Sequence, residues 1–69
     1  MKLDLHGILH EDVQIKVENF VLLNQDSAPL EIITGNSNRM RDLVGTVLTR
    51  IPCDMIDTSQ QGKIVVRKV

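Results

Sequence analysis

The sequence contains few aromatic residues and a single cysteine. Phe20 is the one aromatic residue, so Val, Ile, Leu and Met have to fill the core. Cys53 is the one cysteine, which excludes an internal disulfide and suits a reducing cytoplasm. A chain of 69 residues with 42% hydrophobic residues is enough for one small packed domain, which we place over residues 1–69.

Long apolar runs and a large net charge are missing too. No apolar run approaches the ~20 residues of a membrane-spanning helix, so we expect no membrane partner. The start, Met1–Asp4, already carries an acid, unlike a signal peptide, and we expect a cytoplasmic protein. The net charge of −1 argues against a protein that coats nucleic acid by charge alone. Arg39 and Arg41 still form a local basic patch.

Hydrophobic periodicity predicts an α/β fold with the element order β-α-β-α-β-β. We expect strands over residues 3–6, 30–34, 53–58 and 63–69, and helices over residues 10–24 and 40–51. Polar turns separate these elements at residues 24–29, 35–38 and 59–62, and Pro52 ends the second helix. A strand–helix–strand crossover makes the first two strands parallel, so both strands end at the same edge of the sheet.

Three features of the apolar pattern predict how the elements are covered. The first helix has a stripe at Val13, Val17, Phe20 and Val21. Ile15 and Leu22 lie off this stripe, so we expect the helix to be buried on more than one side. The adjacent Ile32 and Ile33 favour a central strand covered on both faces. Gly45 costs about 1 kcal/mol inside a helix relative to Ala, and we expect a neighbouring element to approach it closely.

The turn between the second strand and the second helix is a candidate anion site. Gly35 permits close approach, and one of Asn36, Ser37 and Asn38 is expected to cap the helix. The free backbone N–H groups of the first helical turn attract a phosphate oxygen, and Arg39 and Arg41 add charge nearby. The turn taken alone favours the alternative of an ordinary helix cap.

A second candidate segment, residues 4–10, follows the first strand. Asp4 and His6 are expected on one side of the strand end, about 6–7 Å apart. A carboxylate near a histidine stabilises the protonated ring, and such a histidine can serve as general acid or base in phosphodiester cleavage. The alternative is a surface pair without chemistry, which the spacing alone favours.

Metal chemistry has weaker support in the same segment. His10 stands at a helix start and is expected to face solvent or a phosphate. No fourth ligand accompanies Asp4, His6 and His10, which argues against a tightly bound transition metal. Asp4 alone offers an oxygen ligand for a weakly held Mg²⁺ or Mn²⁺.

Two motifs in this order resemble the small MutS-related domain, the Smr domain. They are LDLHG, residues 3–7, and IITGNSNRMRDLV, residues 32–44, and the similarity covers essentially the whole chain as a free-standing domain. The resemblance implies a two-layer α/β sandwich with a four-stranded mixed sheet and two helices, similar to the C-terminal domain of bacterial translation initiation factor three. It also implies nucleic-acid binding, in many members nicking or endonuclease activity on DNA or RNA, with functional roles for Asp4 and His6.

The second motif departs from the family pattern. The family commonly has His-Gly-x-Gly, whereas this chain has Thr34, Gly35, Asn36 and Ser37. Thr34 and Ser37 can bind a phosphate but do not shuttle protons near neutral pH, so binding is better supported than cutting unless His10 supplies the second imidazole. Three functions stay open: a nicking endonuclease, a non-catalytic nucleic-acid-binding module, and a protein-interaction domain that lost the site. A free-standing copy finds its substrate alone or with a separate protein partner.

Overall fold

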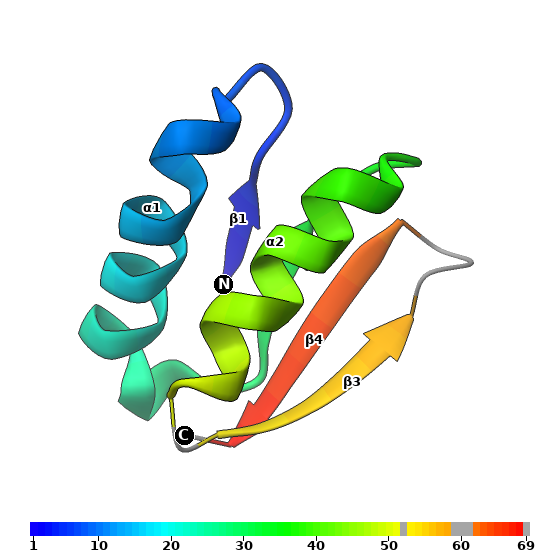
Figure 1. The fold of residues 1–69 in the computed structure, drawn as a ribbon. Coiled ribbons are helices and arrows are strands. Elements are labelled where there is room, and N and C mark those ends of the chain that lie inside the picture. The colour runs from blue at the N-terminus through cyan, green and yellow to red at the C-terminus, as the bar shows by residue number, and fades with distance from the viewer. Residues whose placement is uncertain (52, 59–61, 69) are drawn as a thin grey trace.

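The computed structural model describes residues 1–51, 53–58 and 62–68 (Figure 1). Its elements are β1 (Lys2–Asp4), α1 (His10–Leu23), a short 3-10 helix η1 (Gln25–Ser27), β2 (Leu30–Ile33), α2 (Asn38–Thr49), β3 (Asp54–Thr58) and β4 (Lys63–Lys68). This order confirms the predicted β-α-β-α-β-β arrangement. No helix in these described ranges is both long and apolar enough to cross a membrane.

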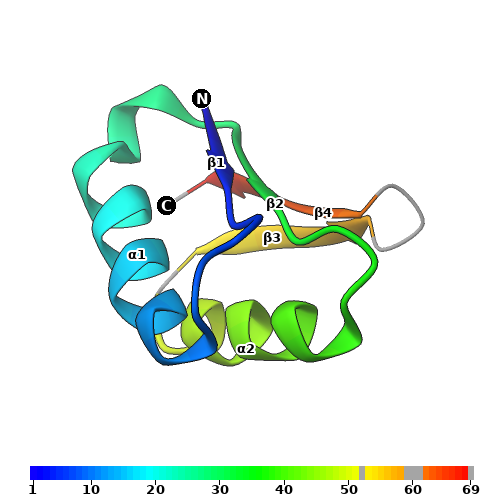
Figure 2. The same cartoon turned by 90° about the horizontal axis from the view of Figure 1, so that it is seen from above.

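The four strands form one mixed sheet with the order β1-β2-β4-β3. β1 and β2 are parallel, as predicted, with Leu3 opposite Ile32. β4 runs antiparallel to both of its neighbours, β2 and β3. Figure 2 shows α1 and α2 on the same side of this sheet, which makes two layers. The predicted two-layer α/β sandwich with a mixed four-stranded sheet and two helices is therefore confirmed.

The core lies between the two helices and the covered face of the sheet. On α1 the buried residues recur every fourth position, which places them on one side of the helix. β2 and β4 contribute every second residue, as expected for strands with one buried face. The largest fully buried side chains among those that the structure describes are all aliphatic: Leu5, Val13, Val17, Val21, Leu30, Ile32, Val44, Leu48, Ile64 and Val66.

Two predictions about the strands were wrong. The first strand ends at Asp4, so His6 lies in a turn instead of on a strand face. This turn closes with a hydrogen bond from the Ile8 N–H to the Leu5 carbonyl at 3.0 Å. β2 is central, but the helices cover only one of its faces, and Ile33 is therefore only half-buried.

Two predictions about the helices were wrong as well. Among the described residues, a Cβ atom added at Gly45 would meet nothing within 4 Å, so none of the described elements packs closely against this position. Ile15 and Leu22 are 62% and 51% exposed, because α1 buries a single face against the core. The periodic spacing of apolar residues identified the helices correctly but not the number of faces that the domain covers.

The C-terminal half follows the predictions with small shifts at its boundaries. β3 begins at Asp54, one residue later than expected, and β4 is described as far as Lys68. Gly62 has φ +70, the left-handed conformation expected for a glycine in this turn. Pro52, the predicted end of the second helix, lies outside the described residues, as do residues 59–61 and 69.

Candidate functional site

The two candidate segments meet at one edge of the sheet, beyond the carboxyl ends of β1 and β2. The Leu5 N–H donates to the Ile33 carbonyl at 3.1 Å, which continues the parallel pairing past the end of β1. Residues 5–9 then lead into the first turn of α1, and residues 34–37 lead into the first turn of α2. The sequence expectation that these segments are neighbours is therefore confirmed.

Asp4 fixes the backbone of the turn that carries His6. Its Oδ1 accepts a hydrogen bond from the His6 backbone N–H at 2.9 Å. Both residues are exposed, and Gly7 is exposed beside them. The carboxylate thus holds the turn in shape through the His6 backbone, whereas the sequence suggested that it stabilises the protonated imidazole. The catalytic roles of Asp4 and His6 stay predictions.

Thr34 and Gly35 bind the protein itself through their hydrogen-bond donors. The Gly62 carbonyl accepts from the Thr34 N–H at 2.8 Å, the Gly35 N–H at 2.9 Å and the Thr34 hydroxyl at 3.2 Å. Thr34 is only 7% exposed. A Cβ at Gly62 would lie 3.2 Å from the Gly35 carbonyl oxygen, a tight contact, and its φ of +70 also favours glycine at this position. These donors attach the end of β2 to the start of β4 and are not available to a phosphate.

Ser37 is the cap of α2, one of the three residues expected in this role. Its Oγ accepts a hydrogen bond from the Met40 N–H at 3.1 Å. The N–H groups of Asn38 and Arg39 precede the first intrahelical hydrogen bond, so they face outward from the helix end. Asn36 is exposed in the turn just before the cap.

Arg41 lies half-buried beside the same helix end. Its Nη2 donates to the Asn38 side-chain Oδ1 at 2.6 Å, within the first turn of α2. This bond holds the guanidinium against the helix that carries it. Arg41 therefore adds positive charge to the helix end, while Arg39 is the exposed arginine there.

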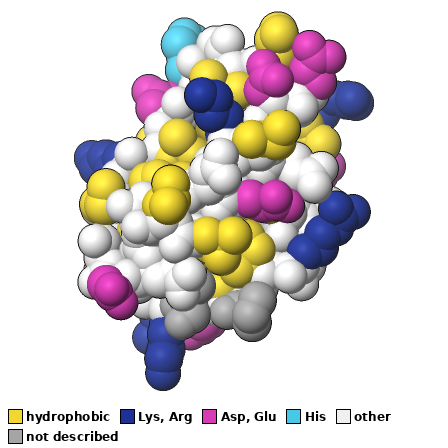
Figure 3. Space-filling view, turned by 90° about the vertical axis from the view of Figure 1, so that its left-hand side faces the viewer, with side chains coloured by type: hydrophobic (Ala, Val, Ile, Leu, Met, Phe, Trp, Pro, Cys, Tyr) yellow, Lys and Arg dark blue, Asp and Glu magenta, His cyan; other side chains and the backbone are white. Residues whose placement is uncertain are grey.

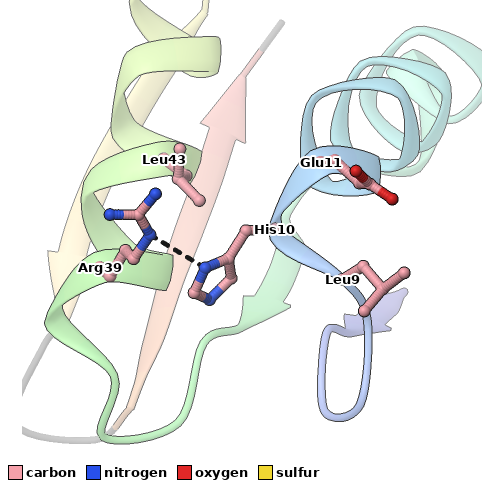
Figure 4. A pocket seen from close by; sticks show the side chains of 5 residues that line it. All are labelled: Leu9, His10, Glu11, Arg39 and Leu43. Carbon is pink, nitrogen blue, oxygen red and sulfur yellow. Dashed lines mark hydrogen bonds between the residues drawn. The ribbon is translucent and has the colours of Figure 1, made fainter.

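A hydrogen bond between His10 and Arg39 joins the first turns of the two helices. The Arg39 Nε donates to the His10 Nδ1 at 2.9 Å (Figure 4). Because arginine stays protonated and has no acceptor atom, the His10 Nδ1 must be unprotonated here, and the neutral ring carries its hydrogen on Nε2. Sequence reasoning named both residues but missed the pair, because they are 29 residues apart and no local pattern links them.

An open hollow of about 520 Å³ lies next to this pair, between the helix ends. It is lined by Leu9, His10, Glu11, Arg39 and Leu43, and in Figure 4 the Glu11 carboxylate points away from Arg39. Leu9 is the N-cap of α1 and offers no side-chain acceptor, so the first N–H groups of α1 remain uncapped. Two helix N-termini and Arg39 contribute positive charge to this hollow while Glu11 contributes a negative charge that points away, so the hollow offers donors that suit an anion.

Metal binding and cysteine chemistry receive little support. Within the described ranges, no group of three or more His, Cys, Asp or Glu residues is placed to hold a metal ion. Asp4 accepts the His6 N–H through Oδ1, so Oδ2 and the second lone pair of Oδ1 could still bind a weakly held Mg²⁺ or Mn²⁺. Burial, and then the nearby Asp54, raise the pKa of the Cys53 thiol, which disfavours the thiolate that a nucleophile needs.

No family model, curated protein or solved structure matches this chain. The resemblance to Smr domains therefore depends on the residues of its two motifs.

Proposed function

We propose that this chain is an Smr-like nucleic-acid-binding domain that holds a sugar–phosphate backbone between the first turns of α1 and α2. The observation that supports this most directly is the hydrogen bond between Arg39 and His10 beside the open hollow. It holds an arginine and an imidazole at the meeting point of two helix N-termini. All three features favour a negatively charged ligand.

The bond uses only part of the hydrogen-bonding capacity of each side chain. Arg39 donates through Nε, which leaves its two terminal nitrogens for a bidentate contact with phosphate oxygens. The His10 Nε2–H is a further donor in the neutral ring. The N–H groups of Asn38 and Arg39 at the start of α2 complete a cradle for one phosphate.

Few cations are available for a longer contact. The net charge is −1, so the domain engages a short stretch of backbone through this cradle and does not wrap a duplex. The affinity should fall with rising salt concentration, but only gradually. Each phosphate contact contributes about −0.9 to the slope of log K against log salt on B-DNA, and few contacts are formed here. DNA and RNA both offer the required phosphate.

Fluorescence anisotropy at low salt, with labelled branched DNA and structured RNA, tests this proposal. Arg39→Gln should weaken binding roughly tenfold and reduce the salt slope by about one, because one phosphate contact is lost. Arg50→Gln is the matched control, since it removes the same charge from the opposite end of α2 and should change affinity little. Equal affinities of the two variants, or no binding by the unmodified chain, would contradict the proposal.

Nicking of the bound strand is a second candidate function, supported by the Asp4–His6 turn. Asp4 fixes the backbone of His6, so an exposed imidazole is held in the turn that leads into the interface. A histidine there can take or give a proton at a phosphodiester. His6→Ala should then abolish nicking of supercoiled plasmid or structured RNA while leaving anisotropy-measured binding within about twofold.

The nicking assay should be run with and without Mg²⁺ or Mn²⁺. Cleavage that survives in His6→Ala would remove His6 from the mechanism. Binding without cleavage by the unmodified chain under all these conditions would identify a binding module without catalysis.

A further inference from the structure

The side of α1 that faces away from the core is unusually apolar. Ile15, Leu22 and Leu23 are 62%, 51% and 82% exposed, although all three are large hydrophobic side chains. Ile15 and Leu22 are seven residues apart, which places them two turns apart on one face of the helix. The core contacts of α1 come from the opposite face, through Val13 and Val17. Nothing within the described part of the chain covers Ile15 and Leu22.

Acidic residues surround this apolar face. Glu11, Asp12 and Glu18 each lie three or four residues from Ile15, so their side chains neighbour it on the helix surface. Lys16 is the one basic residue on α1, which gives the helix a net charge of −2 and leaves +1 for the rest of the chain. Figure 3 views the molecule from this side and shows hydrophobic side chains beside acidic ones.

The charge and the size of this face argue against a second copy of the chain as its occupant. Two α1 helices packed together would bring like charges into contact, which costs free energy. A stable interface buries about 800 Å² on each partner. One helix of 14 residues is only about 21 Å long, so its outer face suits the weaker, transient docking of a single helix better than a stable dimer, which needs the larger area.

We propose that the outer face of α1 docks a basic amphipathic helix of another protein. The outer face is the surface formed by Ile15, Leu22 and Leu23 with their acidic neighbours Glu11, Asp12 and Glu18. An amphipathic helix presents its own apolar stripe to Ile15 and Leu22, and lysines or arginines beside that stripe reach the acids. This face repels phosphates. It shares only Glu11 with the hollow beside Arg39 and His10, and the Glu11 carboxylate points away from Arg39 (Figure 4), so the two sites can be occupied together.

The test uses a synthetic helical peptide of about five turns, with leucines along one side and lysines flanking them. A second peptide of the same composition, with leucines and lysines scrambled around the helix, controls for non-specific charge attraction. The ¹⁵N-labelled chain is titrated with each peptide by NMR, and affinity is measured by calorimetry. Amide shifts should concentrate on α1 for the patterned peptide and stay small for the scrambled one.

Variants then separate the apolar and the charged contributions. The double variant Ile15→Gln, Leu22→Gln should bind the patterned peptide at least about tenfold more weakly. The double variant Asp12→Asn, Glu18→Gln should bind it about threefold to tenfold more weakly at low salt. Asp42→Asn with Asp54→Asn removes the same number of acids elsewhere and should leave affinity unchanged. Circular dichroism confirms that each variant is folded.

Three results would overturn the proposal. They are a failure of the patterned peptide to bind, shifts centred on α2 or the sheet, and unchanged affinity in the Ile15 and Leu22 variant. Sedimentation velocity tests separately whether the chain forms a dimer. A dimer of the unmodified chain that dissociates in the same variant would assign the face to a second copy, against the proposal. Retained nucleic-acid binding in that variant would leave the proposed function unaffected.

Discussion

Glu31 illustrates how one residue links two strands and makes stability depend on pH. The Lys63 Nζ donates to its Oε1 at 2.6 Å across the β2–β4 pair, and Lys2 lies 3.9 Å from its Oε2. The hydrogen bond from Lys63 is the largest cause that lowers the pKa of the Glu31 carboxyl below its ordinary value of 4.5. Desolvation acts in the opposite direction and is the smaller effect.

This lowered pKa predicts acid sensitivity. The folded state holds the Glu31 proton less tightly than the unfolded state does, so the ion pair stabilises the fold above about pH 4.5. That contribution is lost as the pH falls from 4.5 through the lowered pKa. Urea denaturation as a function of pH should therefore show a flatter acid limb in Glu31→Gln and in Lys63→Gln. Arg67→Gln on the same strand is the control, and an equal flattening there would contradict the assignment.

At the same scale, the sequence predicted contacts within one turn better than contacts across the fold. The Ser37 cap could be foreseen because a serine just before a periodic apolar run is a local signal. The pairing of Arg39 with His10 could not, because it depends on how two helices are placed by the sheet. Thr34 was expected to face a ligand, but the position of Gly62 turns its hydroxyl inward.

At the scale of elements, α2 contains a residue that lowers helix stability without a packing reason. Gly45 has helical backbone angles and open space where a Cβ would be. Gly45→Ala should stabilise the domain by up to about 1 kcal/mol, measured by chemical denaturation, because alanine loses less conformational entropy in a helix. Gly35→Ala is the contrasting variant. Its φ of +67 disfavours a side chain, so destabilisation by about 1 kcal/mol is expected there.

The elements themselves were largely predictable because each has a clear period. α1 was found from apolar residues at helical spacing, and β4 from its run of β-branched residues. The end of β1 was misplaced because Leu5 continues the alternation and its N–H still pairs with the Ile33 carbonyl, whereas His6 already lies in the turn. The exposure of Ile15 could not be predicted, since periodicity does not say whether a second apolar face meets a partner within the chain.

At the scale of the whole molecule, stability depends on a small aliphatic core. A domain of 69 residues is stable by roughly 3–10 kcal/mol. Leu30 is fully buried in the central strand β2. Leu30→Ala should cost about 2–5 kcal/mol and lower the denaturation midpoint strongly. Leu23→Ala, at an 82% exposed position, should change the free energy of unfolding by less than about 0.5 kcal/mol. Similar costs at both positions would contradict the assignment of the core.

The parallel pairing of the first two strands followed from the order of elements, because a strand–helix–strand crossover makes its two strands parallel. Parallel strands end at the same edge of the sheet, so the sequence alone predicts that residues 4–10 and 34–41 lie close together. The insertion of β4 between β2 and β3 was not derivable in the same way. This position of β4 brings Gly62 against Thr34, so the Thr34 hydroxyl binds the protein itself and is no longer available to a ligand.

The Gly62 carbonyl accepts three hydrogen bonds from Thr34 and Gly35, and this has a consequence for folding during synthesis on the ribosome. Residues 34 and 35 have been translated long before residue 62 exists. Until Gly62 emerges, the backbone N–H groups of Thr34 and Gly35 and the Thr34 hydroxyl have no carbonyl to donate to. β2 also lacks its antiparallel neighbour β4 until then. The nascent polypeptide therefore cannot complete the turn that precedes α2 until its C-terminal hairpin has left the exit tunnel.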